Sequence, residues 1–243
     1  MHSDSHELEA PSREIILKDV RKILQFGFSQ VVADSYAFKM FLFLPLFLNR
    51  LHNDPEHAAA NGLILSTLNL LFIPAIAPLF GISPDVSGCF GELRATEDDT
   101  KKEVLRNKIR STFQNGCLYA LLVATPAVTL PLIFSEKIFT MLNQESQVST
   151  ISSYFLTRYA NTIAPGFFCF FAGQFFIASG KTNILLAGSF VLGSTLLLSA
   201  GLSFGLGGLP RCDENGVLIA YSIESWLTAA LYATVLFFHP ELS

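Results

Sequence analysis

Two carboxylates stand inside long apolar stretches, where a soluble protein would seldom place them. Asp34 lies in FGFSQVVADSYAF and Glu224 lies in YSIESWLTAAL. An ionisable group at the centre of a bilayer costs roughly 2.5–3.5 kcal/mol on insertion scales, so each residue is a functional candidate. Protonation or a bound cation would remove most of that cost. The expected chemistry is therefore reversible binding of H⁺ or Na⁺, in which no covalent bond changes.

A structural role is the alternative for the same residues. Asp34 could be neutralised by Lys39, Tyr36 or a serine and serve packing alone, and Glu224 could reach the outer interface. Lys39 follows Asp34 by five residues, or about 140° around a helix, so the two side chains do not share a face. The aromatic run GFFCFFAGQFF (166–176) suits either a wall for lipophilic cations or ordinary packing.

Helices must hold these residues, because hydrocarbon offers the backbone no other hydrogen-bond partner. The chain is 51% hydrophobic and 15% charged, and its mean hydropathy is +0.45. A spanning helix needs roughly 20 mostly apolar residues. Six stretches meet this requirement: 23–49, 58–82, 111–134, 152–178, 184–207 and 217–238. We therefore predict an all-α, polytopic membrane protein, a bundle of six transmembrane helices.

The lysines and arginines outside these stretches predict the orientation. Eleven lie in the N-terminal tail and the connections 83–110 and 179–183, against three on the opposite side. The positive-inside rule then places both termini in the cytoplasm of a cell or inner membrane. The predicted organisation is a cytoplasmic N-terminal tail (1–22) and a six-helix transmembrane domain (23–243) with a basic cytoplasmic connection near 92–110.

That connection contains EDDTKKEVLRNKIR (97–110), which predicts a helix with an acidic start and a basic remainder. Val104, Leu105 and Ile109 are expected on one side of it. Such a helix could lie along the inner headgroup layer, or it could be a solvated linker.

Several other classes of function are not expected. No basic groove with interleaved aromatics suggests nucleic acid, and the four cysteines lack the spacing of a disulfide framework or a metal site. The five histidines fall in tails, loops or the end of the last span, without a Ser/His/Asp or Cys/His arrangement. We expect no enzyme activity, no metal and no cofactor. The polar N-terminus does not resemble a cleaved signal peptide, so the first helix would be an uncleaved anchor.

A series of short motifs follows in a fixed order along residues 20–238. They are Gln30 with Asp34–Ser35 in the first stretch, Leu142–Glu145 in an outer loop, Tyr154 and Pro165 in the fourth stretch, the turn Gly180–Thr182, and Gly216, Val217 and Ala220 at the start of the sixth. In order and spacing they resemble the N-terminal half of the multidrug and toxic compound extrusion (MATE) family. The resemblance implies one six-helix lobe of such a transporter.

The resemblance also implies a site, with departures from the family pattern. Asp34 would bind the coupling cation with Gln30 beside it. Thr195 and Ser199 stand where the family's fifth helix usually carries Asn or Asp, and Glu224 is the second buried acid. Family members have two similar halves, and the sequence corresponds to one of them.

The expected function is half-size, MATE-like transport: export of organic cations or drugs in antiport with H⁺ or Na⁺. The second lobe would come from a parallel homodimer or from a separate second-half chain. One alternative is a truncated, non-transporting remnant or an interaction subunit of a split transporter. Another is a lipid-linked saccharide flippase of the same superfamily, but those carry several cationic residues in their cavity. Here Lys39 and Arg158 are the cations within the predicted spans.

Overall fold

The structure is a computed structural model that describes residues 20, 50–52 and 54–238. Among these residues five helical stretches are long and apolar enough to cross a membrane: Pro55–Ala95, Asp99–Ile133, Ser146–Ser179, Asn183–Phe204 and Glu214–Phe237. They confirm the second to sixth predicted spans. The first predicted span, 23–49, lies outside the described residues.

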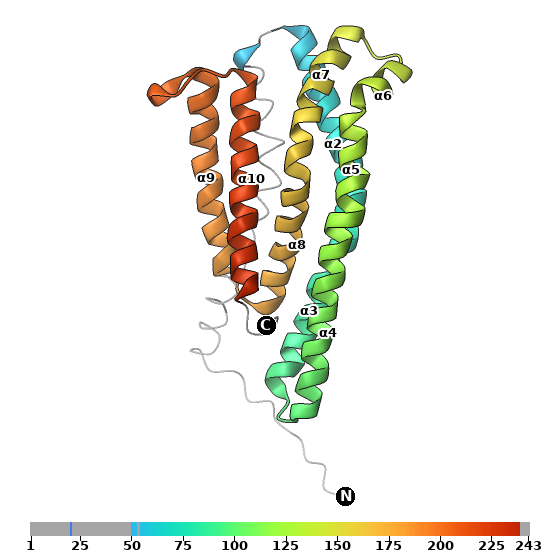
Figure 1. Cartoon of the computed structure of the whole chain (residues 1–243), viewed down its shortest axis with the longest axis vertical. Coiled ribbons are helices and arrows are strands. Elements are labelled where there is room, and N and C mark those ends of the chain that lie inside the picture. The colour runs from blue at the N-terminus through green and yellow to red at the C-terminus, as the bar shows by residue number, and fades with distance from the viewer. Residues whose placement is uncertain (1–19, 21–49, 53, 239–243) are drawn as a thin grey trace, which may run out of the picture.

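The helices run side by side along the long axis of the molecule (Figure 1). In chain order they are α2 (Pro55–Phe80), α3 (Ile82–Ala95), α4 (Asp99–Leu118), the π-helical η1 (Tyr119–Ala124), α5 (Thr125–Ile133), α6 (Ser135–Met141), α7 (Ser146–Tyr159), the 3₁₀ turn η2 (Ala160–Thr162), α8 (Ile163–Ser179), α9 (Asn183–Phe204), the 3₁₀ turn η3 (Leu206–Gly208) and α10 (Glu214–Phe237). We call the end that carries the connection between α3 and α4 the hairpin end. The opposite end, with α6 and the α9–α10 connection, is the loop end.

The second span begins at a strong helix start signal. Asp54 is the N-cap of α2, and its Oδ1 accepts a hydrogen bond from the His57 backbone N–H at 2.8 Å. Pro55 follows at the first helical position, where its missing N–H costs nothing. The hydrogen bonds from the backbone and ring of His57 lower the pKa of Asp54. The ionised carboxylate suits the positive end of the helix dipole.

The connection 97–110 does not form a separate helix that lies flat on the headgroup layer. Asp98 caps α4, and α4 continues through η1 into α5 as a 35-residue helical stretch. At 1.5 Å per residue this stretch is about 52 Å long, well beyond a hydrocarbon core of about 30 Å. Leu105 and Ile109 are buried, whereas Val104 is 63% exposed and does not share their face. Between Asp99 and Leu118 there is no proline and no left-handed glycine, so α4 continues past the predicted connection.

The π-helical turn in this stretch accommodates a proline. Pro126, just beyond it, has no N–H to donate, and the Thr125 hydroxyl donates to the Ala120 carbonyl oxygen at 2.8 Å. Proline and inserted side chains are the usual causes of such local changes in a helix.

The core is centred on α8. Phe167, Phe171 and Phe176 are fully buried, with Phe171 packed on Phe113 and Phe176 on Tyr232, each at 5.2 Å between ring centroids. These rings fill the space between helices, so within 166–176 the structure favours the packing interpretation for them.

Arg94 closes the hairpin end of α8. Its Nη2 donates to the Ser179 carbonyl oxygen at 3.0 Å, next to Gly180, which ends the helix in the left-handed conformation with φ 75°. A cation at a helix C-terminus satisfies a terminal carbonyl and opposes the helix dipole. The Gly180–Thr182 motif is thus a helix-terminating turn that α3 secures.

The helices α9 and α10 approach closely at both ends. A Cβ atom added to Gly216 would lie 2.6 Å from the backbone of Leu202 and Ser203. At the other end a Cβ on Gly188 would lie 3.1 Å from Cζ of Tyr232. The contact at Gly216 involves main-chain atoms of α9, which cannot change rotamer to make room as a side chain can.

We predict that Gly216→Ala destabilises the fold, because the added methyl forces α9 and α10 apart. Overpacking of this kind typically costs about 1–3 kcal/mol. Thermal unfolding of the detergent-solubilised protein would show a lower midpoint. Gly193→Ala is the matched control, since no atom lies within 4 Å of its added Cβ. Equal stability of the two variants would contradict the close approach.

Candidate functional site

Three of the predicted site residues lie in the described part of the chain, and all three are buried. Glu224 on α10 is 1% exposed, and Thr195 and Ser199 on α9 are almost as inaccessible. Asp34 and Gln30 lie outside the described residues. Glu224 does not reach the outer interface; its carboxyl group is inside the helical bundle.

The contacts between α9 and α10 fix which residues share a level. The two helices are antiparallel (Figure 1), and Gly216 contacts Ser203. Eight residues from Ser203 back along α9 is Thr195, and eight residues from Gly216 forward along α10 is Glu224. Because both helices rise equally per residue, Thr195 and Glu224 stand at the same level.

Buried side chains recur every four residues on each of these helices, which places them on one face. On α9 they are Ser203, Ser199 and Thr195; on α10 they are Gly216, Ala220, Glu224 and Thr228. We call these two facing rows the α9–α10 seam. The seam begins at the Gly216 contact and ends near the Tyr232 contact with Gly188.

The seam is polar although both helices are apolar overall. The hydroxyl groups of Ser199, Ser203 and Thr228 are buried and make no hydrogen bond within residues 54–238. The Thr195 hydroxyl donates to the Val191 carbonyl oxygen at 2.9 Å. A carboxylate with several hydroxyl oxygens is a hard oxygen environment, of the kind that hard cations prefer.

Three buried tyrosines lie within electrostatic range of Glu224. Tyr159, Tyr221 and Tyr232 each lie close enough to interact electrostatically with its carboxyl group. Tyr159 comes from α7, and Tyr221 and Tyr232 come from α10 itself. Sequence reasoning missed these phenols and the hydroxyls of Ser203 and Thr228. For Ser203 and Thr228 the available signal was the four-residue spacing from Ser199 and Glu224.

Hydrogen bonds across the bundle hold α10 near α7 and η2. Tyr154 donates to Oδ1 of Asn215 at 3.0 Å, and the Asn161 amide donates to the Ser222 hydroxyl at 2.6 Å. Arg158 is exposed and lies over the Tyr154 ring, 3.5 Å from Cζ to the centroid.

Apolar helices of spanning length around a buried polar seam define an integral, multi-pass membrane protein. The chain matches the MatE family model over residues 36–204, more than two thirds of its length, and it belongs to this family. This confirms the resemblance drawn from the motifs.

A solved structure shows the same fold. The chain is similar to the crystal structure of the eukaryotic MATE transporter AtDTX14, with a TM-score of 0.72 and 15% sequence identity. The match covers 93% of this chain and 47% of AtDTX14, so the chain spans about half the length of that transporter. The predicted likeness to one lobe is confirmed, and at this identity it concerns the fold alone. Comparison with curated protein sequences finds no match.

We predict that cysteines at Ser199 and Ala220 cross-link. These small, buried residues lie four residues from Ser203 and Gly216 on the facing rows of the seam. In a background without the four native cysteines, mild oxidation of the double variant should block thiol labelling. The control pairs Ser199→Cys with Ala229→Cys, which stands nine residues, or about 13 Å, farther along α10. Equal cross-linking of both pairs would contradict the register.

Proposed function

We propose that this chain is one lobe of a cation-coupled antiporter that exports organic cations in exchange for H⁺ or Na⁺. The observation that carries the proposal is Glu224, a carboxylate 1% exposed within a helix long and apolar enough to span a membrane. Thr195 and Ser199 supply oxygens beside it, and Asp34 and Gln30 complete the expected site. Membership of the MatE family supports transport over other uses of a buried acid.

Competition for negative charge provides the coupling mechanism. A carboxylate in low dielectric is stable when neutralised by a proton, Na⁺ or a cationic substrate. Binding of one cation therefore favours release of another. The occupied and empty states differ in the charge of the seam, so each occupant also biases how α9 and α10 pack. Such differential binding is what shifts a conformational equilibrium between two states.

The distribution of lysine and arginine supports an orientation of the chain in the membrane. The hairpin end carries a cluster of basic residues, Arg94, Lys101, Lys102, Arg106, Lys108 and Arg110. We place this end and both termini in the cytoplasm, according to the positive-inside rule. Export then runs from the hairpin end toward the loop end of a cell or inner membrane.

We predict that Glu224→Gln abolishes export while the protein still reaches the membrane. Glutamine keeps the shape of the side chain but cannot take up or release a proton, and Asp34→Asn should have the same effect. Accumulation of a fluorescent lipophilic cation in efflux-deficient cells measures this. Wild-type protein should lower accumulation below the empty-vector level, and both variants should restore it at equal membrane expression.

The matched control is Glu136→Gln, the same chemical change at an exposed position in α6. It should export as well as the wild type. Export by Glu224→Gln at the wild-type rate would refute a role for that carboxylate. Equal accumulation with vector, wild type and all variants would favour the alternative, a non-transporting remnant or an interaction subunit.

A second lobe is part of the proposal, because rocking of two similar halves about a midplane site is a common form of alternating access. We propose a parallel homodimer or a separate second-half chain as its source. An even number of spans lets two copies stand side by side in one orientation.

For the homodimer we predict that two differently tagged copies co-purify from the same membranes in mild detergent. Mixing membranes that each contain one tag should give no co-purification, which controls for association after extraction. Recovery of each tagged copy alone, from cells in which the chain exports, would exclude the homodimer and favour the separate chain.

A further inference from the structure

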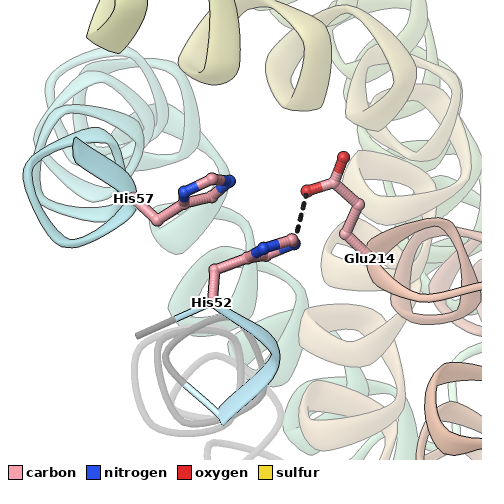
Figure 2. A group of neighbouring side chains, drawn as sticks. All are labelled: His52, His57 and Glu214. Atoms are coloured by element: carbon pink, nitrogen blue, oxygen red, sulfur yellow. Dashed lines mark ion pairs between the residues drawn. The ribbon is translucent and has the colours of Figure 1, made fainter. Parts of the chain in front are cut away.

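The loop end of the bundle brings together three side chains that the proposed transport site does not use. Among the described residues, His52, His57 and Glu214 offer ligand atoms that all lie within 4.8 Å of one another. Figure 2 shows the two imidazoles and the carboxylate facing a common space. His52 precedes α2, His57 lies in its first turn, and Glu214 begins α10. The group therefore joins two segments that are far apart in the sequence.

Asp54 holds His57 in the orientation of a metal ligand. Nδ1 of His57 lies 2.7 Å from Oδ1 and 2.9 Å from Oδ2 of Asp54. An ionised carboxylate only accepts hydrogen bonds, so Nδ1 is the donor, and in the neutral imidazole this tautomer leaves the lone pair on Nε2. A carboxylate behind a histidine is the usual outer partner of a metal-binding imidazole, fixing its tautomer and raising its basicity.

The ring nitrogen of His52 supplies a second, independent observation. Its Nε2 atom is shielded from solvent and makes no hydrogen bond within the described residues. Oε2 of Glu214 lies 3.7 Å away, too far for a hydrogen bond but suited to share an ion. A buried polar atom without such a partner is uncommon and calls for a physical reason.

We propose that His52, His57 and Glu214 bind a divalent transition-metal ion such as Zn²⁺, with Asp54 as a positioning residue behind His57. Two histidines and a glutamate form a known three-ligand set for zinc, with water in the fourth position. Imidazole selects such ions over Mg²⁺ and Ca²⁺, which prefer oxygen ligands.

Binding requires a small local rearrangement. Ligand atoms on a tetrahedral zinc ion are about 3.4 Å apart, given bonds of about 2.0–2.1 Å. The imidazoles of His52 and His57 are stacked, 4.0 Å apart at their centroids and 11° from parallel. An ion lies in the plane of each imidazole that binds it, so the rings tilt apart as the ion enters. The ion then links the segment before α2 to the start of α10.

The test is titration of the purified full chain with ZnCl₂ by calorimetry, after removal of metals and with a purification tag that contains no histidine. We expect one Zn²⁺ per chain and a rise in the thermal unfolding midpoint that MgCl₂ does not produce. Glu214→Gln and His57→Gln should each weaken zinc binding by at least tenfold. Asp54→Asn, which keeps an N-cap residue, should weaken it by about 10–100-fold.

Asp213→Asn is the matched control, because it removes one negative charge next to Glu214 from a carboxylate that pairs with Arg211 at 2.7 Å. It should bind zinc as the wild type does. Equal affinity of wild type, Glu214→Gln and His57→Gln would overturn the site, and so would an equal response to Mg²⁺. Absence of zinc binding to the wild type would also overturn it, whatever the folding of the variants.

Discussion

The obligation to satisfy every backbone hydrogen bond in hydrocarbon governs the rest of this structure. It explains why the described chain remains helical through sequence features that would end helices in water. Gly81 stays in a right-handed helical conformation between α2 and α3, and the strain of Pro126 is taken up by a π-helical turn. The chain turns at the ends of the bundle, as it does at Gly180 and Gly205, which both have positive φ. The membrane environment therefore dictates continuous helices. The function depends on which side chains those helices enclose between them.

The helices α9 and α10 pack closely and also enclose polar side chains. Gly216 lets α9 and α10 approach to backbone contact, and this approach encloses hydroxyl groups and the carboxylate of Glu224. Small residues commonly allow such approach between membrane helices, and interior polar groups hold them together. Here the enclosed polar groups include a carboxylate as well as hydroxyls, so the packing of this pair of helices depends on how those groups are accommodated.

The sequence predicted the five described spans because hydropathy is a local property, and each stretch carries its own signal. The sequence also singled out Glu224 as an acid within an apolar stretch, and Thr195 and Ser199 through the family resemblance. All three are buried, and their role in transport stays a prediction. The sequence could not predict which residues face one another, since register between α9 and α10 depends on the approach at Gly216. Arg94 and Ser179, and likewise His57 and Glu214, are too distant in sequence for any spacing rule to pair them. The length of α4 was missed because a charged composition was taken as a sign of a separate surface element.

The helical stretch from α4 to α5 is continuous, so any tilt of the third span also moves its end outside the membrane. At about 52 Å in length, a tilt of about 10° within the bilayer sweeps one end through roughly 9 Å relative to the other. Arg94 fastens the neighbouring α3 to the end of α8, so the charged tip moves with the core of the lobe and not independently of it. A tilt of that size would leave the contacts between packed side chains nearly unchanged, yet it would move the end of the helix outside the membrane by a distance that an attached probe could measure.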